Sequence, residues 1–264
     1  MNDITEIYES LNAFARTINS RQPDDWWVNQ YGENLTKNSV QYKNAVEVML
    51  TGDPESARLI SQEVRKIRVK SNGNETRTKT YNSTLGFVPN MGRVMTGHPE
   101  NMINLHRQKV NNTKVLNIIY NIAIDYTQAK SEIAIQGARI VGEIINLEKN
   151  GYRVNLYVSL TAKYRESANN AVLLIKVKDS GKPTNITRLA FPLINDSFLR
   201  KVIAAWIETN GSTHNGGYGV PIKNKLGADL IRKTGNFAGF MYTDYYILKK
   251  DSRPVIDILK ENII

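Results

Sequence analysis

A carboxylate and a hydroxyl lie two residues apart where a hydrophobic run ends, within IYNIAIDYTQAKSEIAIQGARIVGEIINLEKNGYRVNLYVSL, residues 119–160. Asp125 and Thr127 offer oxygen atoms, which are the ligands that Mg²⁺ and similar divalent cations prefer. Both side chains are also suited to accept backbone N–H groups where a helix begins. Two interpretations therefore stay open for this position, a cation site and a helix cap or turn.

A basic segment ahead of this run could bind nucleic acid. Six lysines and arginines lie within fifteen residues, and they are Arg65, Lys66, Arg68, Lys70, Arg77 and Lys79. A flexible arm with this charge could neutralise several phosphates, and Tyr81 could stack on a base. A solvated basic loop is the alternative interpretation of the same residues.

The composition narrows the chemistry further. The chain of 264 residues has no cysteine and only three histidines, His98, His106 and His214. Disulfides and thiolate sites are therefore excluded, and a multi-histidine metal centre is hard to assemble. The glycine-rich HNGGYGVP, residues 214–221, lacks the strand and helix context of a dinucleotide site. We expect no cofactor, with Mg²⁺ as the one candidate.

The charge balance favours an anionic partner. Thirty-five lysines and arginines against 25 acidic residues give a formal net charge of +10, which attracts polyanions such as nucleic acid. No apolar window approaches the ~20 residues of a membrane span, and the N-terminus is too polar for a signal peptide. We therefore expect a soluble protein with no membrane partner.

The turn-rich middle of the chain separates two regions of regular pattern. Residues 1–66 carry apolar side chains three and four apart from Ile4 onward, which predicts an α-helical N-terminal region. Residues 67–113 are rich in Gly, Asn, Pro and Thr, which predicts a connector with the basic loop and a short strand or hairpin. Residues 114–264 are predicted to form an α/β sheet domain.

Strand and helix patterns alternate within that domain. A buried strand over 115–125, a helix that ends at Gly151 and a strand over 152–160 predict two parallel neighbours in one sheet. A strand over 170–179 is expected to run antiparallel to the second of them at the edge of the sheet. A helix at 194–211, a short helix at 225–235, a strand at 237–248 and a helix from Pro254 follow.

This order of strand, acidic turn, helix, strand and reversed strand resembles the start of a von Willebrand factor A-like domain. In that family an Asp-x-Ser-x-Ser motif follows the first strand, and its carboxylate and two hydroxyls hold a divalent cation. The matching residues here are Asp125, Thr127 and Ala129, so the second hydroxyl is missing. The resemblance implies a three-layer, Rossmann-like mixed sheet and a degenerate cation site at Asp125 and Thr127.

A second resemblance covers roughly residues 25–210. FVPNMGRVMTGHPENM, residues 87–102, and IQGARIVGEIINLEKNGYRV, residues 135–154, are similar to a family of bacteriophage and mobile-element proteins catalogued as a domain of unknown function. The resemblance implies a viral or mobile-element origin. It also implies other phage proteins as partners, and the bacterial host cytoplasm or the virion as the location.

Three functions remain after these exclusions. The first is a non-enzymatic protein-interaction platform, as a virion component or assembly factor, which fits the lack of a recognisable nucleophile or nucleotide motif. The first alternative is an accessory protein that binds DNA or RNA through the basic arm. The second alternative is a divalent-metal-dependent enzyme built on scattered carboxylates.

Overall fold

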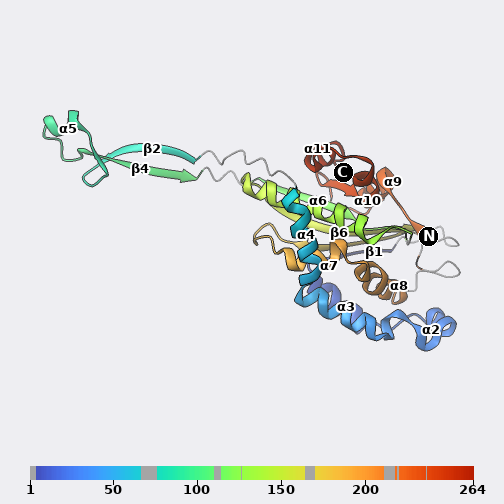
Figure 1. Cartoon of the computed structure of the whole chain (residues 1–264). Coiled ribbons are helices and arrows are strands. Elements are labelled where there is room, and N and C mark those ends of the chain that lie inside the picture. The colour runs from blue at the N-terminus through green and yellow to red at the C-terminus, as the bar shows by residue number, and fades with distance from the viewer. Residues whose placement is uncertain are drawn as a thin grey trace.

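The computed structural model describes a layered α/β body and a hairpin arm that extends from it (Figure 1). The described residues are 4–66, 76–109, 114–125, 127–163, 170–210, 218, 220–235 and 237–264.

The body is built on a mixed sheet with the strand order β1 (Ile4–Tyr8), β7 (Asn170–Lys178), β6 (Arg153–Lys163), β5 (Val115–Asn121) and β9 (Met241–Asp244). β5 runs parallel to both β6 and β9, β7 runs antiparallel to β6, and β1 runs parallel to β7. The short β8 (Val220–Pro221) pairs antiparallel with the end of β6. The predicted parallel neighbours are confirmed, with Val115 opposite Arg153.

Two predictions about the sheet are wrong. The helix expected from Ile4 is a strand over residues 4–8, because Ile4, Glu6 and Tyr8 are half-buried while the residues between them are exposed, a period of two. That strand covers the outer side of β7, so the antiparallel strand is confirmed but does not lie at the edge. The apolar spacing of Ile4, Ile7 and Leu11 fits a helix, but pairing with β7 makes residues 4–8 a strand.

The N-terminal helices are α1 (Leu11–Ser20), α2 (Asp25–Tyr31), α3 (Val40–Thr51) and α4 (Pro54–Lys66), with single 3₁₀ turns at Gly32–Asn34 and Thr36–Asn38. Gly52 ends α3 with a φ of 107°, and the Asp53 carboxylate accepts the backbone N–H of Ser56 at the start of α4. These two residues define the break between α3 and α4.

The remaining helices of the body are α6 (Lys130–Lys149), α7 (Ile186–Ile194), a π-helix (Phe198–Ile203), α8 (Ala204–Glu208), α9 (Asn224–Lys233), α10 (Tyr245–Lys250) and α11 (Val255–Glu261). The helix predicted at 194–211 is thus divided between a π-helix and α8. The strand predicted at 237–248 stops after four residues, because the Asp244 carboxylate accepts the N–H of Ile247 and caps α10.

Both faces of the sheet are buried. Leu156 and Val158 of β6 belong to the larger apolar cluster, to which α4, α6 and α7 also contribute. Tyr157, which alternates with them, packs in a second cluster with Ile231 of α9. At the far edge, the C-terminal residues cover β9, since the N–H of Tyr242 donates to the carbonyl of Asn262 at 2.8 Å.

The arm is a separate three-stranded sheet made of β2 (Thr76–Ser83), β3 (Val88–Pro89) and β4 (Met102–Lys109), with the short α5 (Met91–Met95) at its far end (Figure 1). β2 and β4 pair antiparallel over eight residues, from Thr76 opposite Lys109 to Ser83 opposite Met102. The hairpin predicted for the connector is confirmed. No helix among the described residues is long and apolar enough to cross a membrane.

Candidate functional site

Asp125 lies in the loop that follows β5, and its carboxylate has two polar partners. Lys223 forms an ion pair with Oδ2, and the Tyr246 hydroxyl donates to the same oxygen at 2.6 Å. The Lys223 ammonium also lies 4.0 Å from the centre of the Tyr246 ring. Partial burial acts to raise the pKa of Asp125, but the hydrogen bonds from Lys223 and Tyr246 outweigh it and hold that pKa below its usual range.

The other residues of the predicted cation site have contacts of their own. Thr127 is exposed and accepts a hydrogen bond from its neighbour Gln128, and Ala129 begins α6 without a capping side chain. The backbone carbonyl of Asp125 closes a turn with the N–H of Gln128 at 3.2 Å. In the described part of the chain, no group of three or more His, Asp or Glu side chains could hold a metal. This donor set does not fit a divalent cation, because an ammonium group already neutralises its one carboxylate.

A buried polar network fixes the loops around Asp125. The Asn121 side chain donates to the Thr161 hydroxyl at 2.7 Å and to the Tyr242 hydroxyl at 3.0 Å, which joins β5, β6 and β9. Asp244, only 1% exposed, accepts the N–H of Asn224 at the start of α9. Burial raises the pKa of Asp244 despite these hydrogen bonds. The network therefore holds the segment that carries Lys223 against the strand ends.

An apolar groove of about 450 Å³ opens beside Asp125, at the ends of β5 and β6. We call it the strand-end groove, and its lining includes Ile124, Leu160, Leu199, Ile203, Ile207 and Val220. Grooves at the carboxyl ends of parallel strands are common binding sites in α/β sheets. Asp125 is part of this lining, whereas Thr127 is not, and most of the lining residues are apolar.

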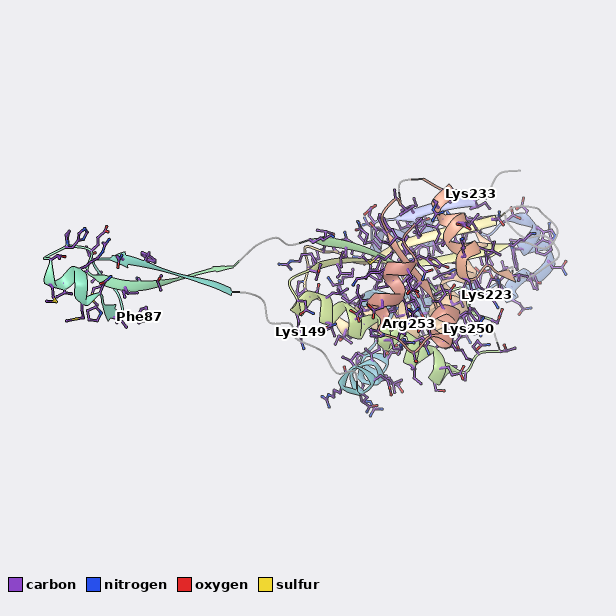
Figure 2. The ribbon with its side chains drawn as sticks, turned by 90° about the horizontal axis from the view of Figure 1, so that it is seen from above. Phe87, Lys149, Lys223, Lys233, Lys250 and Arg253 are labelled. Atoms are coloured by element: carbon purple, nitrogen blue, oxygen red, sulfur yellow. The ribbon has the colours of Figure 1, made fainter. Side chains whose placement is uncertain are left out.

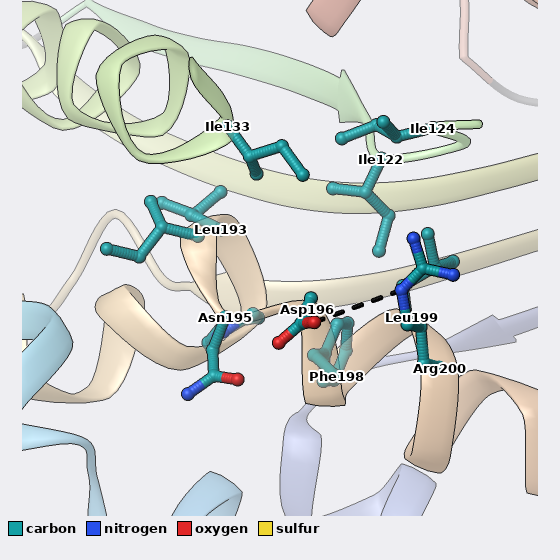
Figure 3. Close-up of a pocket in the computed structure, with 11 residues that line it drawn as sticks. Ile122, Ile124, Ile133, Leu193, Asn195, Asp196, Phe198, Leu199 and Arg200 are labelled. Carbon is teal, nitrogen blue, oxygen red and sulfur yellow. Dashed lines mark ion pairs between the residues drawn. The ribbon is translucent and has the colours of Figure 1, made fainter. Parts of the chain in front are cut away.

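The π-helix contributes Leu199 and Arg200 to the lining of the groove and also to a smaller hollow, which Figure 3 shows in close-up. In that hollow Ile122 and Ile133 lie opposite Leu193 and Phe198, and Asp196 pairs with Arg200 at 3.9 Å. Lys130 of α6 also contacts Asp196, at 3.1 Å. Asp196 is therefore shared by two cations, and the three groups together carry a net charge of +1. π-helices are rare and often occur at functional sites.

The basic residues predicted to bind nucleic acid do not form one loop. Arg65 is exposed in the last turn of α4, and Lys66 is the final residue of that helix. Arg68 and Lys70 lie outside the described residues.

The last two basic residues lie on the arm. Arg77 and Lys79 occupy β2, where their positions pair with Gln108 and His106 of β4. The structure therefore places them on a two-stranded ribbon and separates them from Arg65 by the chain between α4 and β2.

The far end of the arm carries an apolar surface that the sequence analysis missed. Its exposed large side chains, which we call the arm tip, are Leu85, Phe87, Val88, Met91, Val94 and Met95. Leu85 is 79% exposed and Met95 83%. The sequence signal for this surface is the density of Val, Met, Leu and Phe inside a turn-rich segment, which has no helical or strand period.

Backbone contacts hold the arm tip in a defined shape. The N–H of Phe87 donates to the carbonyl of Ile103 at 3.1 Å, and the N–H of Asn90 donates to the carbonyl of Asn101 at 2.7 Å. Gly86 permits this close approach, because a Cβ there would lie 2.5 Å from the Ile103 carbonyl oxygen. The exposed side chains are thus presented on an ordered turn.

A protein-family model matches residues 1–260 of the chain. No curated protein matches the chain. No solved structure matches it either.

Proposed function

The chain belongs to the family described as a domain of unknown function (DUF7192). For this chain we propose a non-enzymatic function, as a protein-interaction platform that docks a partner protein with its arm tip. The proposal includes a role as a structural or assembly component of a phage or mobile element. It also includes a von Willebrand factor A-like core, which the strand order β7-β6-β5-β9, with β7 reversed, supports.

The exposed arm tip is the observation that carries this proposal. Phe87 is 58% exposed and Met91 62%, in a cluster of six large apolar side chains. Apolar patches of about 300–600 Å² are the largest that a typical monomer exposes, and they are often functional. Buried aromatic and methionine anchors are typical of the centre of protein interfaces. A partner that covers this tip would gain from burying it.

The ordered turn adds to the argument. Exposed side chains on a flexible loop lose conformational freedom when they bind, and that loss weakens association. Here the Phe87 and Asn90 backbone groups are already paired with β4 and its preceding residue. A pre-formed tip therefore loses little freedom on docking.

The polar groups at the strand ends support a binding role over a catalytic one. Asp125 is neutralised by Lys223, and Asp244 is occupied as a helix cap. Glu132 pairs with Lys249 and accepts a hydrogen bond from Tyr245. Each of these carboxylates thus has a structural partner, which makes it a poor general base.

Nucleic-acid binding is the second candidate. Where only β2 and β4 pair, the arm is a two-stranded ribbon, with Arg77 and Lys79 on β2 and Arg107 and Lys109 on β4. A ribbon of this kind fits the major groove of DNA, and basic residues on it would contact phosphates. Such binding would weaken steeply as salt rises.

A photo-crosslinking experiment distinguishes the two candidates. A benzophenone amino acid replaces Phe87 in the arm tip, and a matched variant carries it at Val40, an apolar residue of α3 that is 68% exposed. We expect the variant at position 87 to form a discrete protein adduct in the cell of origin, absent from the variant at position 40. Adducts sensitive to nuclease would favour the second candidate, and equal labelling at both positions would contradict the docking function.

A further inference from the structure

We propose that the partner of the arm tip is a second copy of this chain, whose strand-end groove receives the tip, so that copies join head to tail. This inference rests on the proposed docking function and names its partner. It is carried by the placement of the two surfaces, by their matching chemistry and by the pairing of their charges.

The two surfaces lie at opposite ends of the molecule. β4 ends at Lys109 and β5 begins at Val115, so the arm joins the body where β5 starts. The groove lies where β5 ends, about 23 Å further on at 3.3 Å per residue for its seven residues. Figure 2 shows Phe87 far beyond Lys149, which lies on the side of the body nearest the arm, whereas Lys223, the partner of the groove's Asp125, lies farther from it.

This placement favours contact between copies. In both views the arm points away from the body, so the arm tip is directed away from the groove of its own chain. In this arrangement the two surfaces do not meet within one molecule, but they can meet between molecules.

The chemistry of the two surfaces matches. The arm tip presents aliphatic, methionine and phenylalanine side chains. The groove wall is mostly aliphatic, as at Ile124, Leu199 and Ile203, and also includes Asp125, Arg200 and Tyr218. Methionine side chains are flexible and fill irregular apolar spaces, which suits Met91 and Met95 to such a groove. Burial of apolar surface would drive the contact at roughly 25 cal/mol per Å² before the costs of association are subtracted.

The charges near both surfaces are already paired. Arg93 lies 3.9 Å from Glu100 at the tip. In the lining of the groove, Asp125 forms an ion pair with Lys223, and Arg200 lies 3.9 Å from Asp196. Docking therefore brings no unpaired charge from these pairs into an apolar contact. The +10 charge of each copy opposes association at long range, and salt screens that repulsion. Association is thus expected to strengthen as salt rises, the reverse of nucleic-acid binding.

A contact between two different surfaces of one chain is heterologous, so every bound copy still offers a free tip or a free groove. The assembly then grows into an open chain, or closes into a ring if the rotation between copies permits it. A contact through one self-complementary surface would stop at a dimer.

Complementation between two variants tests the inference with purified protein. Phe87→Asp places a charge in the tip, and Val220→Asp places one at the exposed rim of the groove, where Val220 is 42% exposed. Sedimentation velocity is measured at low and at high salt, at protein concentrations from about 1 to 100 µM, which span the dissociation constants of weak protein contacts. We expect the wild type and the Val40→Asp control to form species larger than dimers, and each variant alone to stay monomeric.

The mixture of the two variants gives the decisive result. One variant supplies an intact groove and the other an intact tip, so an equal mixture is expected to form dimers and nothing larger. A monomeric wild type, a mixture without dimers, or a Val220→Asp variant that assembles like the wild type overturns the inference. The docking function survives each of these results if position 87 still crosslinks to a different protein. Circular dichroism of each variant confirms that the fold is retained.

Discussion

Gly137 in α6 provides a sharp test of the packing that positions the strand-end groove. An added Cβ at this glycine would lie 2.3 Å from the Ile194 Cγ2 atom and 3.0 Å from the Leu193 carbonyl oxygen. Ile194 ends α7, just ahead of the π-helix that forms the groove wall. Replacing Gly137 by Ala must therefore push α7 away from α6.

Two opposing effects decide the size of the change. Alanine favours a helix over glycine by about 1 kcal/mol, which would stabilise an exposed site. Overpacking a well-filled core costs about 1–3 kcal/mol, and a contact with a branched methyl and with backbone lies at the upper end. We expect Gly137→Ala to lower the free energy of unfolding by about 2 kcal/mol, measured by urea denaturation, with a fall in Tm of about 4–8 °C.

A double-mutant cycle supplies the control. Ile194→Leu removes the Cγ2 methyl and keeps the side-chain volume, so alone it should cost less than about 1.5 kcal/mol. Combined with Gly137→Ala, it should recover part of the loss and give a clearly non-additive total. A Gly137→Ala protein as stable as the wild type, or strictly additive effects, would refute the close packing of these helices.

Three further predictions follow from single contacts. Asp53→Ala removes the hydrogen bond that caps α4, and it should lower the free energy of unfolding by about 1–2 kcal/mol at pH 7. Burial acts to raise the pKa of Asp53, but its hydrogen bonds with Ser56 lower it overall. The stabilisation by the Asp53 carboxylate is therefore present above the usual aspartate pKa and is lost as pH falls through the lowered pKa. In urea denaturation at several pH values, the free energies of unfolding of the wild type and Asp53→Ala should approach each other in acid. Lys223→Met should raise the pKa of Asp125 in an NMR titration, and calorimetry of the wild type with Mg²⁺ should give no heat of binding at that carboxylate. Glu208→Gln should lower the free energy of unfolding by about 1–3 kcal/mol, measured by thermal unfolding. The fully buried carboxylate accepts the backbone N–H groups of Thr36 and Lys37 at 2.8 and 2.9 Å, and an amide offers only one oxygen.

The parallel pair at the centre of the sheet was predictable because its strands are buried on both faces. Such strands are continuously hydrophobic, as in residues 115–124, and the helix between them carries a clear three- and four-residue period. The N-terminal strand was not predictable in the same way. Ile4 and Ile7 are three residues apart and so fit a helical period, whereas the strand places them on opposite faces and leaves Ile7 exposed. Pairing with β7 favours the strand.

Only part of the candidate site, too, could be predicted from the sequence. The position of Asp125 at the end of β5 follows from the hydrophobic run, but its partner Lys223 lies 98 residues away and has no local signal. The arm tip was hidden by its own turn residues, since a short apolar stretch without a period resembles an irregular loop. Its exposure depends on β2 and β4 extending together away from the body, which is a tertiary property.

The arm contributes no buried core residue to the protein at any of the positions where burial is described between β2 and β4. Substitutions in the arm are therefore not limited by the core packing that constrains substitutions in the sheet and its helices. Members of one family could then keep a nearly constant body while the hairpin changes in length and in the side chains at its end. Partner choice would thus be free to evolve independently of folding stability.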